Sequence, residues 1–248
     1  MCATCGCGGT GVRVTELGAH GHGHGHSHDP DHGRVVELEE DILGANDALA
    51  AANRRALAEQ EVLAVNLMSS PGSGKTTLLV RTLLDVGAEL AITVVEGDQE
   101  TLLDAERIGA TGARVVQVNT GAGCHLDATM LARAMAALAP PRGSVMVVEN
   151  VGNLVCPALF DLGEAARVVV MSVTEGADKP LKYPHMFRTA DLVLLNKVDL
   201  LPYVDFDVAA CIEAVQRVRP GAEVLSVSAT RGDGLDAWYA WLRAARAR

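Results

Sequence analysis

Apolar residues in this chain form short continuous runs, and segments with helical spacing separate these runs. The runs lie near residues 63–68, 91–95, 115–118, 145–148, 167–173, 191–195 and 224–227. The helical patterns lie near residues 75–86, 101–109, 126–138, 208–217 and 234–247. Apolar strands that alternate with helices form a parallel sheet that is covered on both faces. The pattern therefore predicts an α/β fold, with a mainly parallel sheet and helices on both of its faces.

The first 33 residues do not follow this pattern. They consist largely of glycine, histidine and cysteine, and they offer too little aliphatic surface to offset the entropy of an ordered chain. We therefore expect residues 1–33 to be a flexible tail in the absence of metal. From Val35 to about Gln60, apolar residues at helical spacing predict one or two helices. The predicted organisation is a tail over 1–33 and one domain with a leading helical segment over 34–248.

Composition and charge narrow the range of partners. Hydrophobic residues make up 49% of the 248 residues and aromatic residues only 3%, which fits one aliphatic globular domain with appendages. The net charge is −10 and the basic residues are scattered, which argues against nucleic acid and anionic membranes. The N-terminus lacks the regions of a signal peptide, and no apolar run is long enough to span a membrane. We expect a cytoplasmic protein whose reduced cysteines are available for metal.

Residues 69–77, Ser-Ser-Pro-Gly-Ser-Gly-Lys-Thr-Thr, follow the first apolar run directly and precede a helical pattern. A strand, a glycine-rich turn and a helix start in this order are typical of a phosphate-binding loop. In such a loop backbone N–H groups cradle a triphosphate, Lys75 reaches the β- and γ-phosphates, and Thr76 ligates Mg²⁺. The predicted phosphate-binding residues are Gly72, Ser73, Gly74, Lys75, Thr76 and Thr77. One departure is Ser69, which stands where the general pattern has its first glycine.

A second motif, Asn-Lys-Val-Asp at residues 196–199, follows the apolar run 191–195 and matches the guanine-specificity motif of GTPases. The carboxylate of Asp199 can accept hydrogen bonds from N1–H and the 2-amino group of guanine, whereas adenine offers neither donor. Asn196 is expected to hold the base edge, and the stem of Lys197 to cover the base. The predicted base-binding residues are Asn196, Lys197 and Asp199, with Ser228 and Ala229 in the short loop after the last run. Taken alone, the four-residue motif also fits a turn at the end of a strand.

Ligands of parallel sheets bind beyond the carboxyl ends of the strands, where two acidic residues follow apolar runs. Asp98 is expected on a mobile loop that carries its carboxylate to Mg²⁺ or to the attacking water. Glu149 leads to Gly152, in a pattern that resembles the acidic-x-x-Gly motif whose backbone senses the γ-phosphate. The candidate catalytic residues are Lys75, Asp98 and Glu149, and the candidate Mg²⁺ ligands are Thr76, Asp98 and Glu149. Either acid alternatively serves only to cap a strand end.

Three cysteines, Cys2, Cys5 and Cys7, lie within the first seven residues, with glycines that let the backbone fold around a metal ion. Three thiolates with the terminal amine in one plane would favour Ni²⁺, whereas tetrahedral closure would favour Zn²⁺. The residues do not decide between the two, and disulfide chemistry is a further alternative. The histidines that follow, mostly alternating with glycine, predict several weak sites for Ni²⁺, Zn²⁺ or Cu²⁺, although an expression tag is a mundane alternative. They are His20, His22, His24, His26, His28 and His32.

A second set of metal-binding side chains lies inside the domain. Cys124 and His125 stand side by side at the start of a predicted helix, and Cys156 follows Gly152 by four positions. If Cys156 moves with Gly152, metal geometry and nucleotide state would be linked. Alternatively, the cysteines are small buried apolar residues and His125 is a polar surface residue. Cys211 lies on a predicted helix among apolar residues and is assigned to the core.

Together these motifs resemble the hydrogenase nickel-incorporation GTPase family, HypB, over residues 1–9 and about 35–242. The segments that carry the resemblance are the Cys-x-x-Cys-Gly-Cys opening, Ser-Ser-Pro-Gly-Ser-Gly-Lys-Thr-Thr, Glu-Gly-Asp-Gln, Gly-Cys-His-Leu-Asp, Glu-Asn-Val-Gly-Asn-Leu-Val-Cys-Pro and Asn-Lys-Val-Asp. Ser69 fits this family, so the missing glycine is no objection. The resemblance implies a homodimeric GTPase of the signal-recognition and nitrogenase-iron-protein-like P-loop class.

The resemblance also implies a function and a set of partners. The expected function is delivery of Ni²⁺ to the large subunit of [NiFe] hydrogenase, together with a nickel-binding maturation accessory protein. The resemblance implies Ni²⁺ at the three N-terminal cysteines, a nucleotide-responsive Zn²⁺ or Ni²⁺ site at Cys124, His125 and Cys156 near the dimer contact, and nickel storage by the histidines. We expect hydrolysis of GTP to GDP and phosphate to be slow, because no arginine finger or water-positioning glutamine follows Gly152.

Three alternatives remain at this point. A urease-accessory metallochaperone would have a similar core, but its expected Cys-Pro-His is Cys156-Pro157-Ala158 here. A nickel or zinc buffer with a regulatory nucleotide domain would bind metal with an affinity that ignores the nucleotide. An ATP-driven partitioning or membrane-targeting protein is disfavoured by Asp199.

Overall fold

The computed structural model describes residues 30–98, 102–121 and 123–248, with side chains from residue 43 onward. Helix α1 spans Pro30–Glu59, so it confirms a leading helix but begins inside the segment that was predicted to be flexible. Proline is favoured at the first position of a helix, a signal that the apolar spacing does not report. The predicted tail ligands Cys2, Cys5, Cys7 and His20 to His28 lie outside the described residues, and the side chain of His32 does as well.

The described residues form a sheet of seven strands in the order β3-β2-β4-β1-β5-β6-β7, and every pair of neighbours is parallel. The strands are β1 (Leu63–Ser69), β2 (Thr93–Asp98), β3 (Arg114–Asn119), β4 (Val145–Glu149), β5 (Ala166–Ser172), β6 (Leu192–Asn196) and β7 (Glu223–Ser226). Each predicted strand is present, and the predicted parallel sheet is confirmed. The strand order reverses beside β1, which is where ligands of such sheets bind.

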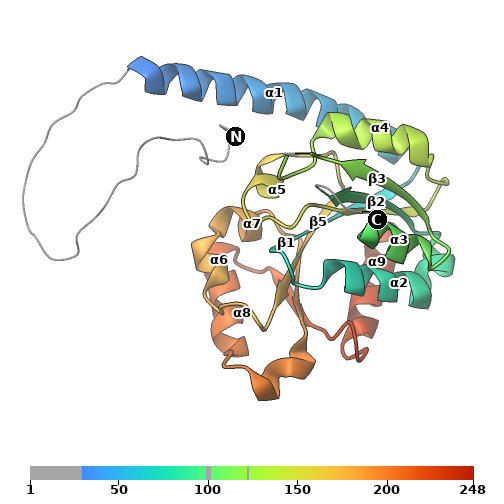
Figure 1. Cartoon of the computed structure of the whole chain (residues 1–248), viewed down its shortest axis with the longest axis vertical. Helices are drawn as coiled ribbons and strands as arrows, with labels where there is room; N and C mark the ends of the chain where they lie inside the picture. Colours follow the sequence, from blue (N-terminus) through green and yellow to red (C-terminus); the bar gives the residue numbers. More distant parts are fainter. Residues whose placement is uncertain (1–29, 99–101, 122) are drawn as a thin grey trace, which may run out of the picture.

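The helices complete the predicted alternation (Figure 1). The five predicted within the domain are α2 (Lys75–Leu90), α3 (Leu103–Gly109), α4 (Ala128–Leu138), α8 (Val208–Val218) and α9 (Leu235–Arg246). The described part of the chain also contains short helical turns that were not predicted: α5 (Cys156–Leu159), α6 (Lys179–Lys182), α7 (Pro184–Arg188) and the 3₁₀ helix η2 (Val198–Tyr203). Each spans too few residues to show a helical period in the sequence.

Both faces of the sheet are covered, because alternate residues of each strand pack on opposite sides. Val65 and Leu67 of β1 pack in a cluster with α2 and α9, where the buried Trp238 donates a hydrogen bond to Thr82 Oγ1 (2.9 Å). Ala64 packs on the other side with α1 and α4. A third cluster joins α7 and α8 to β5 and β6, and it includes Cys211, as predicted for a core residue.

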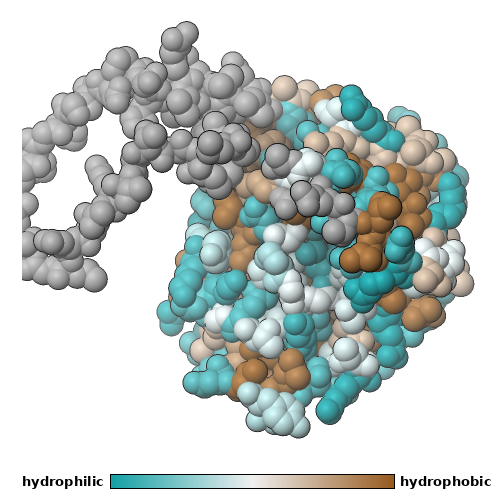
Figure 2. Space-filling model, viewed as in Figure 1, coloured by the Kyte–Doolittle hydropathy of each residue, from teal (hydrophilic) through white to brown (hydrophobic). Residues whose placement is uncertain are grey.

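The surface is predominantly polar in the view of Figure 2, with separate apolar patches. Among the side chains that the structure describes, the large apolar ones that are exposed are Leu49, Leu84, Leu102, Leu103, Val155, Leu181 and Tyr203. Within the described part of the chain, no helix has the length and apolar content needed to cross a membrane.

Candidate functional site

The carboxyl ends of β2 and β4 extend further than the sequence indicated. Glu96, Gly97 and Asp98 were predicted to follow a strand, but they are its last residues and pair in register with residues 117–119 of β3. Glu149 is likewise the last residue of β4. The prediction was wrong because apolar periodicity reports side chains, whereas a strand continues as long as its backbone pairs. Asp98 is therefore the last residue of a strand.

The phosphate loop has a backbone shape that only glycine accepts readily. Gly72 and Gly74 have φ angles of 75° and 95°, in the left-handed region. A Cβ atom on Gly74 would also lie 2.6 Å from Nδ2 of Asn196. The loop thus connects the end of β1 to the start of α2, and the N-terminus of a helix favours a bound anion.

A cleft of about 530 Å³ opens at this end of the sheet and gathers most of the predicted nucleotide residues. Its lining includes Gly72, Ser73, Gly74, Lys75, Thr76, Thr77, Glu96, Asp98, Asp104, Arg107, Glu149, Asn150, Gly152 and Lys197. Gly152 lies against the phosphate loop, since a Cβ atom there would be 3.1 Å from Cα of Pro71. Residues from five separate segments of the chain thus converge on one cavity.

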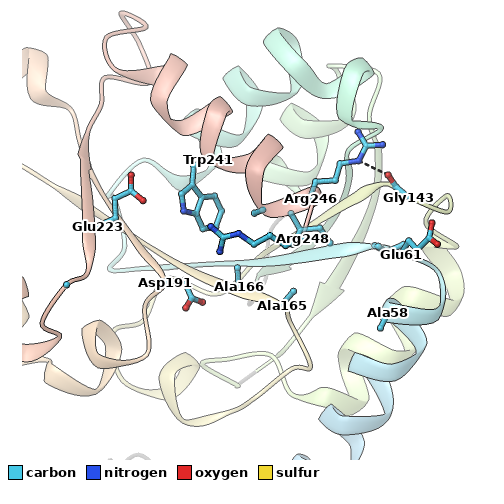
Figure 3. A pocket seen from close by; sticks show the side chains of 14 residues that line it. Ala58, Glu61, Gly143, Ala165, Ala166, Asp191, Glu223, Trp241, Arg246 and Arg248 are labelled. Atoms are coloured by element: carbon cyan, nitrogen blue, oxygen red, sulfur yellow. Dashed lines mark hydrogen bonds between the residues drawn. The ribbon is translucent and has the colours of Figure 1, made fainter.

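A larger cleft, of about 840 Å³, lies at the opposite end of the sheet (Figure 3). It is lined by the first residues of three strands and by Trp241, Arg246 and Arg248 of the C-terminal segment. Arg246 donates a hydrogen bond to the carbonyl oxygen of Gly143 (2.8 Å), as Figure 3 shows. None of the predicted site residues that the structure describes lines this cleft, so the smaller one is the candidate nucleotide site.

Two buried side chains of the phosphate loop already have partners. Lys75 Nζ donates to Ser69 Oγ (2.7 Å), so the serine that replaces the usual glycine holds the lysine. Burial lowers the pKa of Lys75, an effect that the nearby Glu149 opposes. Thr76 Oγ1 donates to Glu149 Oε1 (2.7 Å). Burial raises the pKa of Glu149, and the charge of Lys75 acts in the other direction.

Glu96 belongs to this site, although the sequence argument passed over it. Its Cα pairs in register with that of Glu149, so the two side chains lie on the same face of the sheet. Burial, followed by the charge of Glu149, raises the pKa of Glu96 to about 8. Among the described residues, no hydrogen-bond partner reaches Oε2 of Glu96 or Oε2 of Glu149. The role of Glu96 follows from its position opposite Glu149 at the ends of the two strands. That position is known only once the register of β2 and β4 is known, so the sequence alone did not reveal it.

Arg107 of α3 is a second residue that the sequence argument missed. Its Nη2 donates to Thr77 Oγ1 at 3.3 Å, and its side chain lines the cleft beside Asp104. The arginine brings a positive charge to a cavity that is lined by four carboxylates.

The guanine-motif residues meet at the ends of β6 and β7. Asn196 is buried, its Nδ2 donates to the carbonyl oxygen of Ser73 (3.0 Å), and its Oδ1 accepts from the N–H of Ala229 (3.1 Å). Lys197 has a φ of 62° and donates from Nζ to the carbonyl oxygen of Gly72 (2.7 Å). The motif therefore holds the phosphate loop through hydrogen bonds from two of its side chains. This role comes in addition to the base contact that was predicted for Asn196.

Asp199 and Ser228 complete this end of the site. Ser228 Oγ donates to Asp199 Oδ1 (2.6 Å), and Asp199 is the second residue of the short η2 segment. This bond holds one oxygen of the Asp199 carboxylate. It also joins the segment after β6, which carries Asp199, to the segment after β7, which carries Ser228. The structure thus brings all five predicted base-binding residues together across 33 positions of sequence.

The internal metal residues form a compact cluster. One ligand atom from each of Cys124, His125 and Cys156 lies within 4.8 Å of the others. The two sulfur atoms are 2.9 Å apart, and Cys124 Sγ is 3.7 Å from His125 Nδ1. Cys124 and His125 come from the loop before α4, and Cys156 is the first residue of α5. The fold thus brings the thiol of Cys156 to the adjacent Cys124 and His125, although Cys156 lies 31 positions after His125 in the sequence. Two thiols and an imidazole suit a borderline metal ion.

The surroundings of the cluster hold its ligands in place. The His125 ring stacks on Phe160, with centroids 3.9 Å apart and planes inclined by 23°. Burial lowers the pKa of His125, which favours the neutral imidazole that binds metal. Cys156 is buried, and Asn153 Oδ1 accepts from its N–H (3.4 Å) and from that of Val155 (2.8 Å). The stacking by Phe160 had no signal in the sequence.

Comparisons with known proteins agree with this architecture. Residues 63–226 match the family model of the CobW/HypB/UreG nucleotide-binding domain. The chain is 59% identical to the hydrogenase maturation factor HypB of Rhizobium leguminosarum bv. viciae, over 87% of this chain and 72% of that protein. Its identity to HypB of Escherichia coli (strain K12) is 55%, over 86% and 73% of the two chains.

Solved structures give the same result. HypB from Archaeoglobus fulgidus is 40% identical and matches with a TM-score of 0.77, over 82% of this chain and all of that one. HypB from Helicobacter pylori, solved in complex with nickel, is 38% identical and also has a TM-score of 0.77, over 82% and 95% of the two chains. By the match to the family model and the identity to these relatives, this chain belongs to the HypB family of hydrogenase maturation factors.

Proposed function

We propose that this protein is a GTP-hydrolysing nickel metallochaperone that assists nickel insertion into [NiFe] hydrogenase. The observation that carries the proposal is the position of the two sites at the same end of the sheet. Glu149 and Gly152 line the nucleotide cleft, and the same segment continues to Cys156 of the metal cluster. The relatives are hydrogenase maturation factors, and one of them was solved with nickel.

Guanine selectivity follows from Asp199. Its carboxylate can pair with two donors of guanine, and adenine would leave it unpaired. Support comes from the rigid setting of the motif, in which Asn196 ties the phosphate loop to Ala229. The base and the phosphates would therefore be held by one connected frame.

The donor set at the phosphate end fits Mg²⁺. Mg²⁺ prefers hard oxygen ligands, and the Oε2 atoms of Glu149 and Glu96 are buried with no partner among the described residues. The Thr76 hydroxyl and the Glu149 carboxylate would hold the ion, with Asp98 beside them. When bound, Mg²⁺ would neutralise charge on the phosphate oxygens.

Hydrolysis would rest mainly on positioning. When the nucleotide binds, Lys75 would give up its hydrogen bond to Ser69 and donate to the β- and γ-phosphates instead. The negative phosphates compensate the buried charge of Lys75 better than a hydroxyl does. The N–H of Gly152, close to Pro71, would contact the γ-phosphate, and Asp98 would orient the attacking water. Turnover would be slow, because no arginine finger or water-positioning glutamine follows Gly152. Such groups raise the rate of hydrolysis by about 10³- to 10⁵-fold in the enzymes that have them.

The metal sites would handle nickel as cargo. Cys124, His125 and Cys156 would bind Ni²⁺ or Zn²⁺ in a manner that depends on the nucleotide, and Cys2, Cys5 and Cys7 would bind Ni²⁺ tightly. The histidines of the tail would store nickel. The protein would act in the cytoplasm as a homodimer, together with a nickel-binding accessory protein and the hydrogenase large subunit.

Complementation tests this function directly. In a hydrogenase-producing strain that lacks its own HypB, the wild-type chain should restore nickel-dependent hydrogenase activity, whereas Lys75→Ala and Cys156→Ala should not. Cys211→Ala is the matched control, because this buried thiol lies in the core beside Met171 and away from the cluster. Full activity with Lys75→Ala would contradict the proposal and favour a metal buffer.

A further inference from the structure

A buried asparagine, Asn150, lies where the nucleotide cleft meets the core. It follows Glu149 directly, precedes Gly152 by two positions and is 1% exposed. Its backbone N–H donates to the carbonyl oxygen of Leu67 (3.0 Å), which anchors it beside β1. Asn150 also lines the cleft, so a nucleotide that draws Gly152 inward acts on its immediate neighbours.

The side-chain oxygen of Asn150 reaches the metal-binding loop. Oδ1 accepts from the N–H of Leu126 (3.3 Å) and from the N–H of Val151 (3.0 Å). Leu126 follows His125 directly, and its side chain is fully buried. One amide oxygen therefore joins the segment that would sense the γ-phosphate to the loop that carries two of the three metal ligands.

The side-chain nitrogen of Asn150 starts a second branch. Nδ2 donates to Asn66 Oδ1 (3.2 Å), and Asn66 Nδ2 donates to Glu164 Oε1 (3.2 Å). Glu164 Oε2 in turn accepts from the N–H of Leu162 (2.8 Å). Leu162 lies two positions after Phe160, the ring on which His125 stacks. This branch thus ends on the segment that follows Cys156.

We propose that Asn150 is the positioning residue that transmits nucleotide state to the Cys124–His125–Cys156 cluster. The inference rests on the nickel-metallochaperone function proposed above. The physical reason is burial: Asn66, Asn150 and Glu164 are at most 6% exposed, so a bond broken by movement of one group leaves a donor or acceptor without water. A shift of Asn150 is therefore passed on to Leu126 and Leu162.

The test measures nucleotide preference in the full-length protein, with and without Zn²⁺ as the probe metal. The ratio of the affinities for a non-hydrolysable GTP analogue and for GDP is measured once with Zn²⁺ and once without. The coupling factor is the first ratio divided by the second. By linkage this factor equals the effect of nucleotide on metal affinity. Cys156→Ala shows which part of it depends on the cluster.

Asn150→Ala should bring the coupling factor to one, whereas the wild type should show about 5- to 150-fold in either direction. Asn150→Ser, which stays polar and small, replaces it if the alanine variant fails to fold. The matched control is Thr82→Val, which removes the buried hydrogen bond to Trp238 on the other face of the sheet and should keep the wild-type factor.

The outcomes separate this inference from the proposed function. A wild-type factor retained in Asn150→Ala or Asn150→Ser would overturn the role of Asn150 and leave the proposed function intact. A factor of one in the wild type itself would overturn both the role of Asn150 and the proposed linkage. Loss of the factor in Thr82→Val as well as in the Asn150 variants would show general destabilisation and would also overturn the assignment.

Discussion

The phosphate end of the nucleotide cleft takes its shape from the backbone, whereas the metal cluster takes its shape from side chains that pack around it. In the cleft, Gly72 and Gly74 have left-handed φ angles that a contiguous sequence motif specifies. In the cluster, the position of His125 depends on Phe160, and its loop depends on a hydrogen bond to Asn150. The phosphate loop is a local structure, whereas the cluster is a tertiary one.

This difference has a consequence for variants. Changes in the cleft should affect nucleotide chemistry strongly and leave metal binding in place, because the phosphate loop is formed locally. Changes at the cluster should affect metal binding in the same selective way. Only the segment shared by the two regions, from Glu149 to Cys156, should affect both.

The largest expected effect is in the cleft. Lys75→Ala should reduce GTP hydrolysis by about 100- to 1,000-fold, the loss typical when one preorganised charge-stabilising group is removed. Single-turnover hydrolysis measures the loss. Zn²⁺ binding by the Cys124 cluster in the nucleotide-free protein should not change, and a parallel loss of metal affinity would contradict the separation of the two regions.

Removal of a cluster ligand tests the other region. Cys156→Ala should weaken metal binding at the cluster by more than the roughly 10- to 100-fold that loss of an outer-shell partner costs, because a direct donor is gone. Competition with a chelator measures it, in protein whose three N-terminal cysteines are replaced by serine. Cys211→Ala should leave this metal affinity unchanged. Equal losses of affinity in the two variants would contradict the claim that the cluster binds metal.

The cleft and the cluster also differ in how much of each the sequence revealed. The alternation of strands and helices and the phosphate and guanine motifs were legible because each depends on neighbouring residues. Glu96, Arg107 and Phe160 were not, because their roles depend on strand register or on packing between distant segments. The ends of β2 and β4 were misplaced because acidic side chains interrupt the apolar pattern while the backbone pairing continues.

A smaller effect should sharpen the nucleotide assignment. Asp199→Asn should shift the preference from GTP toward XTP by about 10- to 100-fold, since hydrogen bonds to a charged group contribute about 1.5–3 kcal/mol. Binding of fluorescent nucleotides measures the ratio. An unchanged ratio would mean that Asp199 does not contact the base.

The smallest expected effect concerns pH. The pKa of Glu96 rises from an ordinary 4.5 to about 8, so between these values the folded chain holds a proton that the unfolded chain has released. The free energy of unfolding should therefore fall as the pH rises through this range, by about 1–3 kcal/mol for a buried carboxyl group. Glu96→Gln should remove this part of the fall.

Denaturant unfolding at pH 5 and pH 8 checks this, in EDTA and without nucleotide. Glu223→Gln, which changes an exposed carboxylate at the start of β7, is the control and should retain the wild-type pH dependence. The same pH dependence in Glu96→Gln and in the wild type would contradict the assignment of the buried proton to Glu96.

Linkage between the two regions is the central claim, and calorimetric titration tests it most directly. The titration uses Ni²⁺ and Zn²⁺ on the full-length chain with Cys2, Cys5 and Cys7 replaced by serine, and Cys156→Ala in the same background identifies the cluster. The metal affinity of the cluster should differ between the GDP state and a non-hydrolysable GTP-analogue state by about 5- to 150-fold. Equal affinities in the two states would contradict the claim and leave the cluster a static structural site.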